Sequence, residues 1–187
     1  GSLDNKLYAI QGSSAPADSP WPMYGQNAQR TGRMDSEVPY VVSPIKIAEE
    51  IEEISAGYQH SLFIDKNGTL WGMGANGYGQ LGVGKTSDDY PVDDYGDPMA
   101  REVSPVKIAE GVAEISAGAS HGLFIKDDGS LWGMGDNSMK QLGSGKSSES
   151  SGGNDSDLTY LVSPIKIADE IEEISAGYQH SLFIDKN

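Results

Sequence analysis

The sequence predicts an all-β protein assembled from a repeated unit of about 60 residues. Three observations lead to this fold class: a high glycine content, short apolar runs, and motifs that return along the chain. There are 24 Gly among 187 residues, whereas hydrophobic residues make up only 37%. This composition favours a turn-rich β protein over a helical bundle. Dense apolar runs, such as Leu-Phe-Ile at 62–64, distinguish the chain from a disordered segment.

One motif organises most of the chain. The segment Ser-Pro-Ile/Val-Lys-Ile-Ala begins at Ser43, Ser104 and Ser163. Each copy continues into Glu-Ile-Ser-Ala-Gly, then a His, then Leu-Phe-Ile. The first two copies close with Leu-Trp-Gly-Met-Gly at 70–74 and 131–135, whereas the third stops before that segment. Because missing a repeat would misassign the whole fold, this period takes priority over local patterns.

Within each repeat, the local chemistry predicts antiparallel strands. Ile-Lys-Ile and Glu-Ile-Ser alternate apolar and polar residues, as half-buried strands do. Residues 65–68 and 126–129 lie between apolar runs and offer Gly or Asn for the positive φ of a hairpin turn. The polar stretches 85–101 and 144–159 vary while the strands are kept, which is typical of surface loops.

We divide the chain into an N-terminal strand with its linker, residues 1–40, and a repeat region. The repeats cover residues 41–102, 103–161 and 162–187, and the third lacks its last strand. Leu-Tyr-Ala-Ile at 7–10 can be laid over Leu-Trp-Gly-Met at 70–73, so an N-terminal strand is the candidate that completes the third repeat. Alternatively, Gly-Ser-Leu at 1–3 matches residues 129–131, unless its first two residues are a cloning remnant.

The repeat region resembles the regulator of chromosome condensation repeat. The shared pattern is Trp-Gly, Asn, Gly-Gln-Leu-Gly, Pro-x-x-Val/Ile and Ala-Gly-x-x-His-Ser, carried by residues 68–82 and 104–125. The second repeat departs from it at Gly122 and at Ser-Met-Lys 138–140. This resemblance implies a β-propeller with about three four-stranded blades per chain. Residues 6–10 and 19–33 are similar to parts of quinoprotein-like propeller proteins, which implies a bacterial cell-surface or extracellular setting without a quinone cofactor.

Three blades are too few for a propeller, which needs about 4–8 to close a ring. We therefore expect a homo-oligomer in which residues 6–11 pair with the strand at 181–186 of a neighbouring chain. Such strand exchange gives a ring or, by head-to-tail addition, a filament. A third alternative is a fragment of a longer repeat protein. The residues expected to mediate self-association are Leu7, Tyr8, Ala9, Ile10, Leu182, Phe183 and Ile184.

The charge balance argues against two classes of partner. Thirteen Lys and Arg face 28 Asp and Glu, a formal net charge of −15. Nucleic acids and anionic membranes are bound by clustered basic residues, so neither is an expected partner. No apolar run approaches the roughly 18 residues that membrane insertion requires. The absence of Cys removes disulfides, thiolate ligands and cysteine nucleophiles.

Catalytic and cofactor motifs are also lacking. His60, His121 and His180 recur at one position of every repeat, so we predict a structural role in which each ties a turn by hydrogen bonds. Trp71 and Trp132 recur likewise, and we expect them in the core. The run at 79–86 fits a phosphate-loop pattern, but its acidic sequel is not the helix that such a loop requires. We predict no enzyme and no cofactor.

The acidic loop is the candidate metal site. Its carboxylates could bind Ca²⁺ through oxygen atoms, but they lack the spacing of a known calcium loop, and a solvated acidic run is the simpler interpretation. These residues are Asp88, Asp89, Asp93, Asp94 and Asp97. We predict a non-enzymatic, extracytoplasmic scaffold that binds proteins through loops 85–101 and 144–159. The alternative is a subunit of an extracellular filament that polymerises by donated strands.

Overall fold

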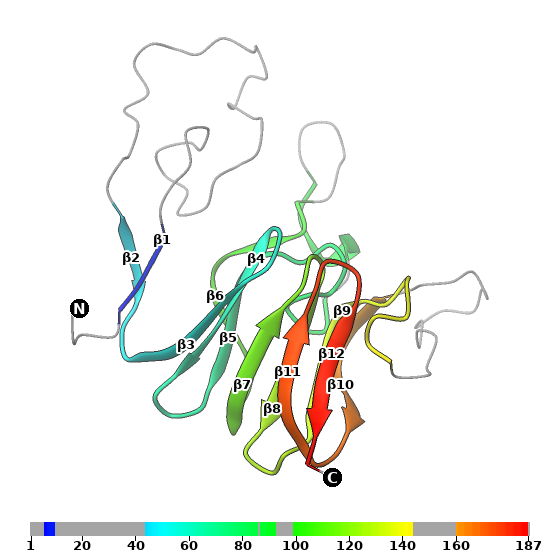
Figure 1. Ribbon diagram of the computed structural model, residues 1–187. Helices are drawn as coiled ribbons and strands as arrows, with labels where there is room; N and C mark the ends of the chain where they lie inside the picture. Colours follow the sequence, from blue (N-terminus) through cyan, green and yellow to red (C-terminus); the bar gives the residue numbers. More distant parts are fainter. Residues whose placement is uncertain (1–5, 10–43, 86, 93–98, 144–159, 187) are drawn as a thin grey trace. The chain divides into compact units, whose positions relative to one another are not determined.

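The computed structural model of the chain describes residues 6–9, 44–85, 87–92, 99–143 and 160–186. In this part the chain is almost entirely antiparallel β-structure (Figure 1). Its single helical element is the short 3₁₀ turn η1, Ser87–Asp89. None of the described helical structure is long and apolar enough to cross a membrane.

Blade 1 is a four-stranded sheet in the order β3-β4-β5-β6. Each strand pairs with the next along the chain, and in the β4–β5 ladder Phe63 lies opposite Trp71. A tight turn with Gly68 at φ 72° joins these two strands, as the sequence predicts. The strands are β3 Ile51–Ala56, β4 His60–Asp65, β5 Leu70–Ala75 and β6 Arg101–Ala109.

Blade 2 repeats this arrangement, and the third copy of the motif forms half of it. Blade 2 pairs its strands in the order β7-β8-β9-β10, and a two-stranded sheet of β11 and β12 follows. We call this sheet the half-blade. The strands are β7 Val112–Ala117, β8 His121–Lys126, β9 Leu131–Asp136, β10 Tyr160–Ala168, β11 Ile171–Ala176 and β12 Ser181–Asp185.

An N-terminal hairpin forms a sheet of its own. Strand β1, Leu7–Ala9, pairs antiparallel with β2, Ile45–Ala48. The chain divides into two compact units, Gly1–Ile51 with this hairpin and Glu52–Asn187 with the blades.

The predicted all-β class with four-stranded blades is confirmed, but blade boundaries differ from repeat boundaries by one strand. The Ile-Lys-Ile segment, which opens each repeat in the sequence, is the last strand of a sheet rather than the first. It lies in β6 and β10 of the two complete blades and in β2 of the hairpin. Each repeat therefore spans two sheets, which ties neighbouring blades together covalently.

Neighbouring sheets share an apolar core. Strand β7 of blade 2 contacts β4 of blade 1, and β11 of the half-blade contacts β7 and β8 of blade 2. The core between blades 1 and 2, which we call core A, contains buried residues of both. Core B, between blade 2 and the half-blade, is built in the same way. Each blade therefore buries its faces only against its neighbours, as expected for a repeat protein.

Candidate interaction surface

Each repeated His packs against the Gly that lies three residues before it. A Cβ on Gly57 would lie 2.3 Å from Cε1 of the His60 ring and 2.6 Å from the carbonyl oxygen of Gly118 in the next blade. The turn itself is tied by the backbone, because the N–H of Gly57 donates to the carbonyl of His60 at 2.9 Å. The sequence predicted hydrogen bonds from the imidazoles. The His60 and His121 rings fill the space that Gly57 and Gly118 leave open between blades. Of these two rings, His121 makes a hydrogen bond, to Ser181, whereas His60 has none among the described residues.

Two of the three imidazoles are buried. His60 and His121 are at most 1% exposed, whereas His180 is exposed on the half-blade. Nε2 of His121 lies 3.0 Å from Oγ of Ser181, a contact between blade 2 and the half-blade. The position equivalent to Ser181 in blade 2 is Gly122, which has no hydroxyl. Among the described residues, neither ring nitrogen of His60 therefore has a hydrogen-bond partner.

Burial determines the ionisation of these groups. Desolvation, reinforced by the neighbouring His121, lowers the pKa of His60 from 6.5 to about 4. Desolvation also lowers the pKa of His121, although Asp136 opposes this shift. Both imidazoles are thus held neutral at physiological pH and serve as packing groups between blades.

The repeated Glu-Ile-Ser segment holds the first strands of adjacent blades together. Oγ of Ser55 accepts the backbone N–H of Ala117 at 2.9 Å, and Oγ of Ser116 accepts that of Ala176 at 2.8 Å. The Glu of the segment makes a second, longer contact: Oε1 of Glu114 accepts the N–H of Ile174 at 3.2 Å. The blade-to-blade bonds thus follow the repeat, each blade binding the next.

The half-blade ends in an open apolar edge. Leu182, Phe183 and Ile184 of β12 are 63%, 50% and 54% exposed. Their equivalents in β4 and β8 are among the most buried side chains of the described chain. The Leu and Ile residues pack in the cores shared with the next blade, and each Phe lies opposite the Trp of the neighbouring strand. We call these three residues of β12, which belongs to a sheet of only two strands, the open edge.

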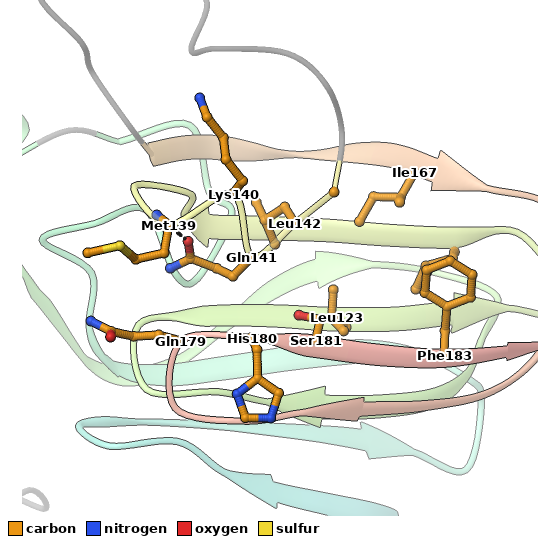
Figure 2. A pocket seen from close by; sticks show the side chains of 12 residues that line it. Leu123, Met139, Lys140, Gln141, Leu142, Ile167, Gln179, His180, Ser181 and Phe183 are labelled. Atoms are coloured by element: carbon orange, nitrogen blue, oxygen red, sulfur yellow. Dashed lines mark hydrogen bonds between the residues drawn. The ribbon is translucent and has the colours of Figure 1, made fainter.

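A groove runs beside the open edge. It has a volume of about 210 Å³ and lies between the loop after β9 and the half-blade (Figure 2). Leu142 and Gly143 line it from blade 2, and His180, Ser181 and Phe183 from the half-blade. The equivalent space between blades 1 and 2 is filled: Met134 lies so close to Gly82 that a Cβ there would be 2.5 Å from its Sδ.

Blade 1, at the other end of the row of blades from the half-blade, also has an exposed apolar residue. Ile54 on β3 is 63% exposed, whereas its equivalents Ile115 and Ile174 are 5% and 7% exposed. The latter two are covered because each faces a preceding blade. Repeat alignment treats the three positions as equivalent, so sequence reasoning missed the exposure of Ile54. Its position was a signal that could have been used, because Ile54 lies in the first strand of the first blade.

The N-terminal hairpin has the geometry of half a blade. Leu7 lies opposite Ala48 and Tyr8 opposite Lys46, with a register shift between the two pairs. In blade 1, Leu70 lies opposite Ala109 and Trp71 opposite Lys107, with the same shift. Blade 2 repeats the arrangement. Strands β1 and β2 therefore correspond to the third and fourth strands of a blade, in agreement with the alignment on residues 70–72 of residues 7–9, the described part of the aligned segment.

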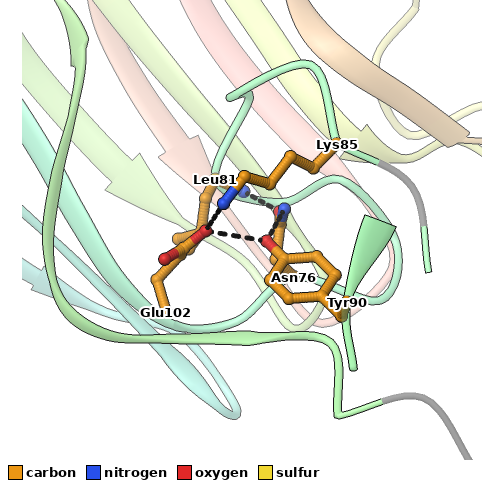
Figure 3. A network of polar contacts seen from close by, with 5 residues as sticks. All are labelled: Asn76, Leu81, Lys85, Tyr90 and Glu102. Carbon is orange, nitrogen blue, oxygen red and sulfur yellow. Dashed lines mark hydrogen bonds and ion pairs between the residues drawn. The ribbon is translucent and has the colours of Figure 1, made fainter. Parts of the chain in front are cut away.

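A polar network orders the start of the acidic loop (Figure 3). Nδ2 of the buried Asn76 donates to the hydroxyl of Tyr90 at 2.8 Å, and its Oδ1 accepts the N–H of Leu81 at 2.9 Å. The Tyr90 hydroxyl and Nζ of Lys85 both donate to Oε1 of Glu102, at 3.1 and 2.5 Å. Asn76 thereby fixes the Gly-Gln-Leu-Gly loop, and Tyr90 fastens the insertion to the outer strand.

The calcium prediction stays a prediction. Asp88 and Asp89 lie in η1, whereas Asp93, Asp94 and Asp97 fall outside the described residues. Within the described ranges, no three His, Asp or Glu side chains come together to hold a metal ion.

The repeated Trp residues are half-buried rather than fully in the core. Nε1 of Trp71 donates to Oδ2 of Asp65 at 3.0 Å, and Nε1 of Trp132 donates to Oγ of Ser130 at 2.8 Å. The Trp132 ring stacks on Phe124, with centroids 6.3 Å apart and planes 8° from parallel. Each indole covers the neighbouring strand with one face and fixes a hairpin turn with its N–H.

The chain matches two models described as regulator of chromosome condensation (RCC1) repeat. One covers residues 67–125 and 128–184, and the other covers 51–80 and 112–141. The chain is 26% identical over 172 residues to the ultraviolet-B receptor UVR8 of Arabidopsis thaliana, covering 88% of this chain and 33% of the receptor. It is 31% identical over 93 residues to protein RCC1 of Candida albicans, covering 50% of this chain and 20% of that protein.

Solved structures show the same fold. Prp20p of Saccharomyces cerevisiae superposes with a TM-score of 0.61 at 21% identity, covering 79% of this chain and 34% of that one. Human WBSCR16 also gives a TM-score of 0.61, at 18% identity, covering 82% of this chain and 36% of its own. The chain thus spans a third or less of the curated relatives and just over a third of these structures. The relatives named are eukaryotic, so the bacterial setting stays a prediction.

Proposed function

This chain belongs to the regulator of chromosome condensation (RCC1) repeat family, and we propose that it is a non-enzymatic propeller scaffold that binds proteins and self-associates. The open edge carries this proposal. Three contiguous apolar side chains, each half or more exposed, lie on a strand whose equivalents are covered in both complete blades. An uncovered strand edge presents backbone N–H and C=O groups to any strand that can pair with it.

The repeat symmetry supports a scaffold rather than an enzyme. The polar side chains that recur in every repeat, the His and the Glu-Ile-Ser residues, contact neighbouring blades. Catalytic sites bring different groups together at one place, whereas these groups are distributed evenly along the blades. Loops 85–101 and 144–159, which lie partly or wholly outside the described residues, are the segments we assign to further protein partners.

The energy available at the open edge suits reversible association. Full burial of a Leu, Ile or Phe side chain is worth about 1.5–3 kcal/mol, and these three residues have about half of that left to gain. Together they contribute about 3 kcal/mol, to which the ladder of a newly paired strand adds. A single charge at the centre of the edge should remove most of this gain.

Light scattering on the purified chain and two variants tests the proposal. The Phe183→Glu variant should have the mass of one chain under conditions where the original chain is oligomeric. Val103→Glu is the matched control, because Val103 is also half-exposed but lies on β6, away from the open edge. The control should assemble like the original chain. A monomeric original chain, or an oligomer unaffected by Phe183→Glu, would contradict self-association through this edge.

A filament is the second candidate, since head-to-tail contacts that do not close produce open polymers. Electron microscopy distinguishes the two: rings of fixed size support the scaffold, and fibres whose length grows with concentration support a structural subunit.

We also propose an extracytoplasmic, bacterial setting, which is supported by the N-terminal resemblance to quinoprotein-like propeller proteins. Fractionation of the source cells tests this. Recovery of the chain only from the cytoplasm would contradict it.

A further inference from the structure

We propose that β1 of a second copy is the strand that covers the open edge, with Tyr8 of that copy opposite Phe183. This inference rests on the self-association proposed above and specifies its occupant and register. The hairpin β1–β2 would supply the third and fourth strands of the blade that β11 and β12 begin. One blade would then be built from two chains.

The two apolar cores identify the occupant. Core A and core B contain equivalent residues at ten positions, because every member of core B except Leu161 has its counterpart in core A one repeat earlier. Core A has four further members: Val83, and three residues on β8 and β9 of blade 2, which are Phe124, Met134 and Trp132. By repeat alignment, these three correspond to Phe183, to residue 10 and to Tyr8. Core B therefore lacks two contributions that core A has. Phe183 on β12 is half-exposed and is not part of core B, and the residues at the Trp132 and Met134 positions would come from β1 of a second copy.

The register follows from the complete blades. Phe63 lies opposite Trp71 in blade 1, and Phe124 lies opposite Trp132 in blade 2. The hairpin pairs Tyr8 with Lys46 just as blade 2 pairs Trp132 with Lys166. Placing β1 on β12 in this register sets Tyr8 opposite Phe183, where its ring takes the place of the stacked indole. Tyr8 is 47% exposed in the single chain, so it has surface to bury.

The groove fits the same occupant. Its equivalent between blades 1 and 2 holds Met134, which follows the Gly that aligns with Ala9. The residue after Ala9 is Ile10, which lies outside the described residues. The groove beside Leu142 and Gly143 thus offers an apolar space next to the place that β1 of the second copy would take. Apolar filling of this space is what core A shows at its own interface.

Strand β3 of the second copy carries groups that complement the exposed polar residues of the half-blade. Glu173 and Ser175 on the half-blade are exposed and stand at the positions of Glu114 and Ser116, which bind the next blade's first strand. The corresponding N–H groups on β3 of the second copy are those of Ile54 and Ala56, which are equivalent to Ile174 and Ala176. The exposed Ile54 side chain would be buried in the same contact, as Ile115 is in core A.

Disulfide trapping tests the register directly, because the chain contains no Cys. Two single variants, Tyr8→Cys and Phe183→Cys, are prepared separately, mixed and oxidised. Cross-strand partners in an antiparallel pair have Cα atoms about 4.5–5.5 Å apart, within disulfide range. The mixture should give a covalent dimer on a non-reducing gel, and each variant alone should not. Both substituted side chains are half-exposed, and circular dichroism checks that the strands are retained.

The matched control replaces Phe183→Cys with Leu182→Cys. Adjacent residues point to opposite faces of a strand, so this mixture should trap little dimer. Equal trapping in both mixtures would overturn the register. An oligomer by light scattering without trapping would overturn the β1 occupant and leave self-association standing, whereas a monomeric original chain would overturn both. A Tyr8→Cys/Phe183→Cys double variant that closes within one chain would also overturn the second-copy assignment.

Discussion

Acidification should destabilise the folded chain through the buried imidazole of His60. Its pKa falls from 6.5 to about 4 on burial, a gap that corresponds to about 3 kcal/mol at about 1.4 kcal/mol per unit. Between these two values the unfolded chain binds a proton that the folded chain excludes. The contribution to the free energy of unfolding is therefore complete above pH 6.5 and is lost as the pH falls to about 4.

Urea denaturation across this pH window, followed by tryptophan fluorescence, measures the loss. His60→Phe is the control, because it keeps an aromatic ring but removes the titrating group. The difference between the two pH dependences isolates His60 from the 28 Asp and Glu, whose protonation also changes the stability. An NMR titration of the His60 imidazole serves if the variant does not fold. Equal pH dependence of the two chains, or an imidazole that titrates near 6.5, would refute the reasoning.

Three further substitutions test single contacts by urea denaturation. Gly122→Ser should be about 1 kcal/mol more stable than Gly122→Ala, because only its hydroxyl can bind His60 as Ser181 binds His121; equal stabilities would contradict this. Tyr90→Phe should cost about 1–2 kcal/mol by breaking the Asn76 and Glu102 contacts, whereas Tyr78→Phe, on an exposed ring, should be neutral; similar losses would count against the network. Lys140→Gly should gain about 1 kcal/mol by relieving a φ of 62°, and a loss would show that the Lys side chain stabilises the loop.

Local periodicity and repeat alignment were sufficient to predict the strands. Strands are encoded by alternation over a few residues, and the near-identity of the repeats transfers each assignment along the chain. The same alignment placed residues 7–10 on 70–73, and the hairpin register agrees with it over residues 7–9. Pairing between chains stays a prediction.

Properties that depend on position within the array were not predictable from the repeat. Ile54 and Ile115 have the same sequence context, but only the second has a preceding blade to cover it. The same holds for His60 and His180, one buried and the other exposed. Whether a side chain is buried depends on whether a neighbouring blade packs against its strand. Repeat alignment treats all copies as equivalent and does not contain this information.

The network around Tyr90 was missed for a different reason. Tyr90 lies in a variable insertion, and its partners Asn76 and Glu102 are distant in sequence. Nothing in the local pattern links an insertion residue to a particular outer strand. Such contacts depend on the path of the loop, which only the three-dimensional structure provides.

The pairing of β1 with β12 is the centre of the account, and a mixed-label NMR experiment measures it most directly. Isotope-labelled and unlabelled chains are mixed, and contacts are recorded only between unlike chains. The account predicts backbone contacts between Tyr8 of one chain and Phe183 of the other. Absence of these contacts, with the β12 amides exchanging as freely as those of an uncovered strand, would contradict it.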